Sequence, residues 1–413
     1  MRICQFLTSR STLSSIRQLS TGNAKGSDVV IVSALRTPIG SFRGSLSQLS
    51  AAQMATQVIK ALISQSKIKP DQIDEIIMGH ILTHGGGQHP TRQAVINSGL
   101  PSSTVTSTVN KLCASGMKSI MLASGLLSLK QANIMIAGGM ESMSNVPFIL
   151  KRGDANYGHT QLYDALLSDG LIDAFHQIHM GNCGENTAKK YGITREDQDK
   201  FAIGSYEKSA AAAKAGLFDK EKISVTVPDK KAGTKTVSED EEYLKVDFSK
   251  ISSLRSVFQK DGTITAANAS KLNDGAAACI LMRAETAQEH GLNPLVKVVD
   301  YADNELDPID FPEAPVGAIK KLLARNGINK DDVKMWEINE AFSVVPLVHV
   351  KLLDLDPSKV NIHGGAVALG HPVAASGTRI VAHLAHTLKS GEYGIAAICN
   401  GGGGSSAMLV QAL

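Results

Sequence analysis

Hydrophobic and polar positions alternate in a regular rhythm from residue 28 onward. Short β-branched runs predict strands, and longer stretches with apolar residues three or four positions apart predict helices between them. The expected strands cover residues 29–32, 73–78, 105–109, 134–137, 277–282, 295–299, 333–337 and 395–398. Helices are expected to begin near Ser50, Thr91 and Cys113 and to cover residues 194–215, 315–324, 340–353 and 376–388. Such alternation is typical of a mostly parallel sheet covered by helices, so we predict an α/β fold.

This rhythm changes between residues 140 and 258. Gly-, Asn- and Lys-rich connections surround one strong helix there, and the acidic run 239–242 lies among few large apolar residues. We therefore interpret 140–258 as an inserted, largely surface-exposed loop domain. Segments 28–139 and 259–283 would then form an N-terminal half, and 284–413 a C-terminal half.

The two predicted halves resemble each other in sequence. Residues 114–118 (Ala-Ser-Gly-Met-Lys) open a predicted helix that leads to the apolar strand 134–137 and two glycines. Residues 375–379 (Ala-Ser-Gly-Thr-Arg) open another, which leads at the same spacing to the strand 395–398 and a run of glycines. Chance similarity of two helix starts is the alternative, but an internal duplication is the more economical explanation. It predicts a pseudo-twofold core made from two copies of one unit.

The composition is that of an ordinary globular protein. The chain has 413 residues, of which 43% are hydrophobic, and its 42 basic and 39 acidic side chains give a formal net charge of +3. This length predicts at least two domains. The near-neutral balance argues against a nucleic-acid partner bound through a field of positive charge. No apolar stretch approaches the ~18 residues needed to span a bilayer, so no membrane span is expected.

Residues 1–27 are predicted to be a transit peptide. Four basic residues and many Ser and Thr precede the first acidic residue, Asp28, and no continuous apolar segment of the secretory kind is present. Without those four charges the formal net charge of the chain would change from +3 to −1. A merely frayed terminus is the alternative interpretation. We therefore expect import into an organelle.

Two of the five cysteines, Cys113 and Cys399, have positions that suit chemistry. No Cys-x-x-Cys pair occurs, so neither a disulfide framework nor a zinc ribbon fits. Cys113 lies where a predicted strand gives way to a helix, whose positive end should lower the pKa of the thiol. A buried structural cysteine is the alternative. Cys399 ends a strand before a run of glycines, which either lets backbone amides approach a ligand or is a flexible turn.

His371 and Asn339 are further candidates. His371 lies in a turn between glycine and proline, just before the second helix start. Asn339 follows a predicted strand, where it could cap a helix or project its amide into a site at the carboxyl end of the sheet. Two pairs of closely spaced histidines elsewhere could ligate a metal, but no Cys or Glu completes either set. The glycines after Cys399 formally match a dinucleotide fingerprint, yet no helix can follow them, so we reject a nucleotide site.

Together these motifs resemble those of the thiolases. They are Asn-Lys-Leu-Cys-Ala-Ser-Gly around Cys113, Asn-Glu-Ala-Phe from Asn339, Gly-His-Pro around His371 and Cys-Asn-Gly-Gly from Cys399. The likeness runs from about residue 28 to 413 and is nearest to the mitochondrial thiolases that act on acetoacetyl-CoA. It implies a five-layered αβαβα core of two duplicated halves, a place in the mitochondrial matrix and a homotetramer. Ala374 departs from the glycine that thiolases usually have, which affects the expected rate and chain-length preference.

The resemblance also implies a reaction and a role for each motif residue. Coenzyme A would cleave acetoacetyl-CoA or its 2-methyl derivative through an acetyl-cysteine, or two acetyl-CoA molecules would condense in reverse. Cys113 would accept the acyl group, and Cys399 would act as acid and base. His371 would activate Cys113 and donate to an oxyanion, with a water held by Asn339. The amides of Cys113 and Gly401 would form a second oxyanion site. Two thiols suit this chemistry, since the ketone needs a nucleophile and the leaving enolate needs an acid.

Two sets of ligand contacts follow from the same resemblance. Coenzyme A and short-chain acyl-CoA are expected as substrates, with no tightly bound cofactor. The implied coenzyme A contacts are His179, Tyr206, Lys245, Val246, Asp247, Lys250 and Ser270. The mitochondrial members also bind potassium, and the matching positions are Tyr206, Ala266, Ala267, Ala269 and Val367. For the two lysines, a solvated surface face is the alternative.

Two other functions compete with this interpretation. A 3-ketoacyl-CoA thiolase acting on longer chains is the near rival, although Phe311-Pro312 resembles the segment with which the mitochondrial thiolases accept a 2-methyl branch. An inactive lipid carrier or scaffold with the same fold is the second. The presence of both cysteines, His371 and Asn339 argues against it.

Overall fold

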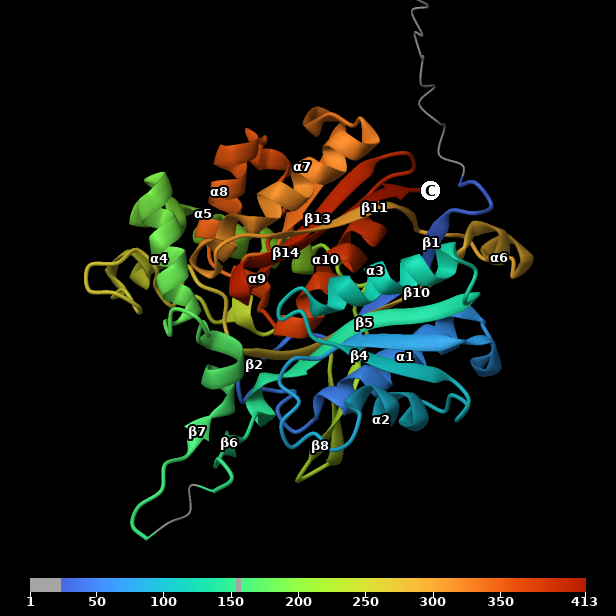
Figure 1. Ribbon diagram of the computed structural model, residues 1–413, viewed down its shortest axis with the longest axis horizontal. Helices are drawn as coiled ribbons and strands as arrows, with labels where there is room; N and C mark the ends of the chain where they lie inside the picture. Colours follow the sequence, from blue (N-terminus) through green and yellow to red (C-terminus); the bar gives the residue numbers. More distant parts are fainter. Residues whose placement is uncertain (1–23, 154–156) are drawn as a thin grey trace, which may run out of the picture.

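One mixed sheet organises the chain. The computed structural model describes residues 24–153 and 157–413 (Figure 1). Ten strands form the sheet in the order β12-β13-β14-β11-β1-β10-β5-β3-β4, with β2 paired to β10. The predicted transit peptide, 1–27, lies outside the described residues except for its last four. Within the described residues, no helix combines the length and hydropathy of a membrane-spanning segment.

The order of elements repeats once along the chain. The first series is β1 (Val29–Arg36), β2 (Gly40–Ser41), α1 (Ala51–Ser66), β3 (Glu75–Gly79), α2 (Pro90–Asn97), β4 (Val105–Val109), α3 (Ser115–Ser128), β5 (Ile134–Ser142) and β10 (Asn273–Arg283). After α6 (Ala284–Glu289), the second series is β11 (Val296–Glu305), α7 (Ala314–Asn326), β12 (Val333–Ile338), α8 (Val344–Leu353), α9 (Ala366–Leu369), α10 (Val373–Thr387), β13 (Tyr393–Asn400) and β14 (Gly404–Ala412). A parallel bridge between Trp336 and Val360 stands in the place of β4. The repeat accounts for the two similar helix starts.

Five layers result, because the sheet wraps around two central helices. α3 and α10 pack on each other and on strands of both halves. α1 and α2 cover the outer face of the first half, and α7 and α8 that of the second (Figure 1). Separate apolar cores fill the spaces on either side of the strands. The predicted fold class, an α/β fold with an αβαβα core from two halves, is confirmed.

The central helices approach each other closely where each has a glycine. A Cβ built on Gly116 of α3 would lie 2.5 Å from the carbonyl oxygen of Ala374, and one on Gly377 of α10 would lie 2.8 Å from the backbone of α3. A larger residue at either position would push the helices apart. Gly116 and Gly377 hold the same place in the duplicated motif. Because Cys113 and His371 precede these two helices, the contact brings both candidate residues to one region.

The sheet is less parallel than the alternation of elements predicted. Parallel pairing is confined to β4–β3–β5 and β12–β13, and the other described strand pairs of this sheet are antiparallel. In each half, the last strand of the series pairs antiparallel with the strand before it: β10 with β5, and β14 with β13. β14 follows β13 after the three-residue turn Gly401–Gly403, which is too short for the crossover that parallel strands need. β10 enters between β1 and β5 after the insertion.

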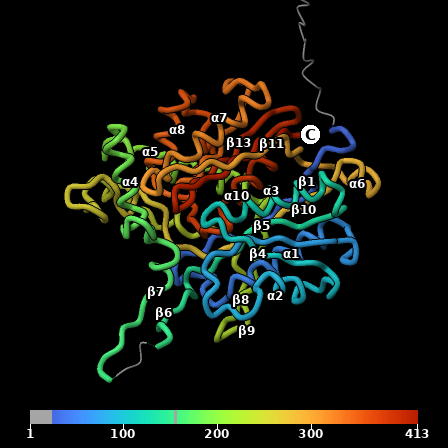
Figure 2. The backbone as a smooth tube through the Cα atoms, in the orientation of Figure 1, coloured from blue at the N-terminus to red at the C-terminus, as the bar shows by residue number. Residues whose placement is uncertain are grey.

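The segment 140–258 is more buried than its composition predicted. It contains the hairpin β6 (Phe148–Ile149) and β7 (Tyr163–Asp164), helices α4 (Met180–Tyr191) and α5 (Arg195–Lys214), and the hairpin β8 (Val225–Asp229) and β9 (Gly233–Val237). The β6–β7 arm projects from the body (Figures 1 and 2). Asp240, however, is 1% exposed and pairs with buried Arg36 at 2.7 Å, as does Glu221. A buried guanidinium requires such partners, so the acidic run does not simply face solvent.

Candidate active site

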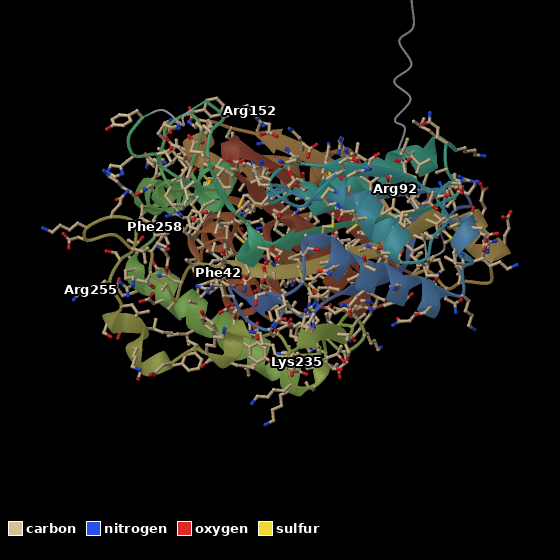
Figure 3. The ribbon with its side chains drawn as sticks, turned by 90° about the horizontal axis from the view of Figure 1, so that it is seen from below. Phe42, Arg92, Arg152, Lys235, Arg255 and Phe258 are labelled. Carbon is tan, nitrogen blue, oxygen red and sulfur yellow. The ribbon has the colours of Figure 1, made fainter. Side chains whose placement is uncertain are left out.

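Two adjoining cavities lie against the insertion. The larger, of about 580 Å³, is lined by residues of both halves and of the insertion, among them Phe42 and Phe258, which Figure 3 labels, and His371. The smaller, of about 220 Å³, shares Lys245 and Lys271 with the larger. A largely apolar cavity with a few polar groups is the usual form of a small-molecule site.

Cys113 lies between β4 and α3, in a loop held by the side chain of Ser115. The backbone N–H of Lys111 donates to Ser115 Oγ at 2.8 Å, and the same hydroxyl donates to the carbonyl of Leu112 at 2.6 Å. Leu112 has a φ of +47°, which turns the chain sharply just before the cysteine. The backbone N–H groups of Gly401 and of Cys113 itself face the thiol. These are the two amides that the resemblance assigned to an oxyanion site.

Burial raises the pKa of the Cys113 thiol to about 12, and the negative charge of Glu141 acts in the same direction. The amides of Gly401 and Cys113 favour the thiolate but do not outweigh the desolvation. The sequence-based prediction of a lowered pKa is therefore wrong. The thiol is neutral near pH 7 and needs a base before it can act as a nucleophile.

Cys399 lies near Cys113 at the end of β13. It is 1% exposed, and burial is the main cause of its raised pKa, to which ionisation of Cys113 at high pH would add. The glycine run after it forms a tight turn, in which Gly402 and Gly403 have φ values of +78° and +90°. A Cβ on Gly401 would lie 3.1 Å from Leu112 Cδ1, so the turn abuts the loop that carries Cys113. The glycines are therefore a close backbone approach rather than a flexible connection.

His371 lines the larger cavity. Its Nδ1 lies 2.6 Å from Ser376 Oγ, and that hydroxyl also lies 3.3 Å from the carbonyl oxygen of Pro372. If the hydroxyl donates to this carbonyl, it accepts the Nδ1 proton, and Nε2 keeps its lone pair. Nε2 has no hydrogen-bond partner among the described residues. Burial lowers the pKa of His371 to about 4, so the ring is a neutral base near pH 7.

Asn339 has a buried side-chain amide. It does not cap a helix, since α8 begins at Val344, and its backbone N–H donates to the Ala397 carbonyl at 2.9 Å. Neither Oδ1 nor Nδ2 of Asn339 has a partner among the described residues. An unsatisfied buried polar group costs about 1–3 kcal/mol, which makes this amide a place for a water or a ligand. Its neighbour Glu340 is fully used in hydrogen bonds to Ser205, Asn361 and Val367.

The predicted coenzyme A contacts gather at the two cavities. Those lining the larger cavity with His371 are His179, Lys245 and Ser270, and those lining the smaller are Tyr206, Lys245, Val246, Asp247 and Lys250. The His179 ring stacks on Phe258 with 4.6 Å between the ring centroids. Exposed Lys250 pairs with Asp247 at 2.8 Å. Their role as coenzyme A contacts stays a prediction.

The predicted potassium positions also lie together, but they surround a lysine. Lys271 Nζ lies 2.5 Å from Tyr206 Oη, 2.8 Å from the Ala269 carbonyl oxygen and 3.1 Å from the Val367 carbonyl oxygen. Tyr206 Oη donates onward to the Ala267 carbonyl at 3.3 Å. A metal cation among these oxygens would meet a like charge at contact distance. The residues of this chain therefore do not fit a potassium ion at that place.

Three residues of the site were missed by reasoning from sequence. They are Ser376, which bonds the His371 ring; Asn273, whose Oδ1 accepts the His371 backbone N–H at 2.8 Å; and Lys271. Ser376 had a usable signal, because in the duplicated motif it matches Ser115, which orders the Cys113 loop. Asn273 and Lys271 follow the insertion in a segment without a motif, and nothing local marked them.

The two residues expected to affect substrate range belong to apolar clusters that the thiols also join. Fully buried Ala374 belongs to an apolar cluster against which Cys113 packs. Buried Phe311 belongs to the same core cluster as Cys399. Neither lines the larger cavity directly. Their effect on chain length stays a prediction.

Comparison with known proteins identifies the family. The thiolase N-terminal domain model matches residues 29–285, and the thiolase C-terminal domain model matches 292–412. The mitochondrial acetyl-CoA acetyltransferase of Xenopus tropicalis is 56% identical over 94% of this chain and 92% of the relative, and that of Homo sapiens is 55% identical over 94% and 91%. The crystal structure of Acat5 thiolase from Ascaris suum in complex with coenzyme A has a TM-score of 0.90 at 48% identity, covering 94% of this chain and 100% of that one. The resemblance is confirmed: the chain belongs to the thiolase family.

Proposed function

We propose that this chain is an acetyl-CoA C-acetyltransferase, which cleaves acetoacetyl-CoA with coenzyme A and catalyses the reverse condensation of two acetyl-CoA molecules. One observation carries the proposal. Two neighbouring thiols, Cys113 and Cys399, lie beside the amide of Gly401, and His371, whose Nε2 has no partner among the described residues, precedes the helix that packs on the helix after Cys113. Relatives 55–56% identical to this chain are named acetyl-CoA acetyltransferases, and the Ascaris suum thiolase was solved with coenzyme A.

The first half of the reaction breaks the carbon–carbon bond. His371 Nε2 accepts the Cys113 proton as Sγ attacks the keto carbon, since a thiol with a raised pKa ionises only during attack. The amides of Cys113 and Gly401, which face this sulfur, suit the alkoxide that forms on the attacked carbon. The bond then breaks, and Cys399 gives its proton to the carbanion of the departing acetyl-CoA. The enolate oxygen accepts hydrogen bonds from the His371 imidazolium and from a water held by Asn339. Each such donor stabilises the developing charge by about 3–4 kcal/mol.

The second half transfers the acetyl group to coenzyme A. The His371 imidazolium first returns its proton to the Cys399 thiolate. Neutral His371 then accepts the proton of the entering coenzyme A thiol as that sulfur attacks the acetyl carbon on Cys113. The same two amides stabilise the new tetrahedral oxyanion. When it collapses, Cys113 leaves as a thiolate and regains its proton from the His371 imidazolium. All three groups return to their starting protonation states, so the cycle needs no external acid or base.

The location, the assembly and the domain division belong to the same proposal. The relatives' names support a mitochondrial protein, and we place it in the matrix.

A homotetramer is supported by two exposed surfaces. One is the sheet edge at β4, where Val105 is 56% exposed. The other is the β6–β7 arm, which exposes the apolar residues Phe148, Leu150 and Leu162. We divide the chain into halves at 28–139 with 259–283 and at 284–413, around the insertion 140–258.

Thiolysis by the purified chain without residues 1–27 tests the function. Acetoacetyl-CoA and 2-methylacetoacetyl-CoA are expected to be cleaved fastest, with rates that fall as the 3-ketoacyl chain lengthens. Faster cleavage of long-chain 3-ketoacyl-CoA would establish the longer-chain thiolase instead. Absence of cleavage with every substrate, in a protein that still binds coenzyme A, would establish a carrier without activity.

A further inference from the structure

Lys271 holds the position that the family resemblance assigned to potassium. We propose that its ammonium group is a built-in monovalent cation, which replaces the ion and makes this chain independent of potassium. The proposal concerns the site that joins the two cavities, and it adds a residue to which neither the motifs nor the family models gave a role.

The geometry accounts for all three protons of the ammonium. An ammonium has three donors and no acceptor, and Lys271 Nζ has three oxygen partners: Tyr206 Oη, the Ala269 carbonyl and the Val367 carbonyl, at 2.5, 2.8 and 3.1 Å. The Nζ also lies 5.2 Å from the centroid of the Tyr206 ring. Backbone carbonyls and a phenol oxygen are hard, neutral ligands of the kind that also bind monovalent metal ions. One set of oxygens can thus serve a lysine or an ion, but not both together.

The charges around the group favour a cation. Glu340 is fully buried and Glu242 nearly so, and the negative charge of each raises the pKa of Lys271 against the effect of burial, which lowers it to about 8. Neither carboxylate is hydrogen-bonded to the lysine; Glu340 bonds to the Val367 N–H and Glu242 to Asn273. Two carboxylates therefore lie around an inner set of neutral oxygens, and a positive charge at Lys271 Nζ is attracted by both.

This cation connects three segments that form the active site. Tyr206 lies in α5 of the insertion, Ala269 in the loop that lines both cavities, and Val367 in α9, which leads directly into Gly370 and His371. Leu272, next to the lysine, forms a β-bridge with His371. Loss of the positive charge on Lys271 should therefore weaken the packing around both cavities and of the segment that carries His371.

Two other roles for Lys271 fit the geometry less well. A general base needs a free lone pair, whereas this ammonium donates all three protons to protein oxygens. A phosphate contact would point the ammonium outward, as exposed Lys250 does, but Lys271 points at backbone carbonyls. Lys271 is therefore a positioning residue, which acts by holding other groups in place.

The unaltered chain provides the first test. Its Tm and its KM for acetoacetyl-CoA are measured in choline, sodium and potassium chloride at equal ionic strength. We expect the same values in all three salts. A rise in Tm or a fall in KM that is specific to potassium would show that an ion still binds, and would overturn the proposal. The KM depends on the proposed function, but the Tm does not, so the cation site is tested even if acetoacetyl-CoA is not the substrate.

Paired substitutions provide the second test. Lys271→Thr opens space among the oxygens, so in choline chloride its Tm should fall and its KM should rise about tenfold, and potassium should restore both. Lys271→Met fills the space without a charge and should show the same losses without restoration. Lys320→Thr, on an exposed face of α7, is the control and should respond alike to all three salts.

The outcome is decided by restoration rather than by loss. If no monovalent cation restores the Tm or the KM of Lys271→Thr, the lysine is an ordinary structural residue and the proposal is wrong. Should Lys271→Thr fold only when potassium is present, the requirement for a cation is shown directly. Should it fail to fold in any salt, the oxygens do not form an ion site when the lysine is absent, and the proposal again fails.

Discussion

The Cys113 thiol and the His371 imidazole are both neutral near pH 7, and burial is the cause in each case. Desolvation penalises the charged form, so it raises the pKa of the thiol to about 12 and lowers that of the imidazole to about 4. Cys113 is therefore a neutral proton donor and His371 a neutral proton acceptor, and the two do not form an ion pair. Charge has to develop on the substrate, where the amides of Cys113 and Gly401 can receive it.

This state predicts the pH dependence of cysteine alkylation. Below a pKa of about 12 the thiolate fraction of Cys113 increases with pH, so the rate of reaction with iodoacetamide should rise about tenfold per pH unit from about pH 6 to pH 9. The labelled residue is identified by peptide mass spectrometry, with Cys113→Ser as the control. A rate that levels off above pH 7 would instead indicate a thiolate stabilised in the resting protein.

Cys113→Ser should abolish acetylation and turnover together. A neutral hydroxyl lacks the nucleophilicity of a thiolate, and His371 is too weak a base to ionise it. Intact-protein mass spectrometry after mixing with acetyl-CoA should show one added acetyl group in the unaltered chain and none in the variant. An acetyl group found on Cys183 or Cys279 would contradict the assignment of the nucleophile.

Cys399→Ala should separate acyl transfer from carbon–carbon chemistry. Acetylation of Cys113 by acetyl-CoA needs the nucleophile, His371 and an oxyanion site, whereas removing or adding the α-proton needs the second thiol. The variant should still exchange acetyl groups between coenzyme A molecules, measured with labelled coenzyme A. Its thiolysis rate should fall by several orders of magnitude, a barrier change of several kcal/mol. Equal loss of both reactions would mean that Cys399 is structural or helps to activate Cys113.

Among the elements, the first turn of α10 orients the imidazole. Ser376 in that turn bonds His371 Nδ1, so Ser376→Ala should free the ring to rotate and to change tautomer. We expect kcat for thiolysis to fall about tenfold to a hundredfold, with little change in KM, because the cavity lining is kept. Ser358→Ala, an exposed serine at a turn, is the control. A rise in KM at unchanged kcat would place Ser376 in binding instead.

At the scale of the whole molecule, the projecting β6–β7 arm predicts the assembly. Its apolar side chains are exposed in the single chain, and a stable partner surface would bury them. Replacing residues 148–164 by a short Gly-Ser linker should reduce the assembly from four chains to two, with pairs still joined elsewhere. Light scattering after size-exclusion chromatography measures this. An unaltered chain that elutes as a monomer would contradict the proposed tetramer.

Local pattern in the sequence determined the fold class and pointed to the principal site residues. The alternation of apolar runs predicted eight strands of the large sheet and the helices between them in the observed order, because each period reflects burial of one face by a single element, but it did not predict β14. The repeated Ala-Ser-Gly motif predicted the two halves, and its glycines are those that set the crossing of α3 and α10. Cys113, Cys399, His371 and Asn339 were recognisable because each follows a strand or precedes a helix at the end of an element.

Tertiary structure alone decided properties that depend on residues distant in sequence. The raised pKa of Cys113 comes from desolvation by the packed core, which outweighs the local helix end that favoured the opposite prediction. Asp240 faces inward because Arg36, about two hundred positions away, is buried beside it. Lys271 occupies the expected potassium position because α5, its own loop and α9 meet there. Burial and charge balance are sums over neighbours in space, and the order of residues along the chain does not contain those neighbours.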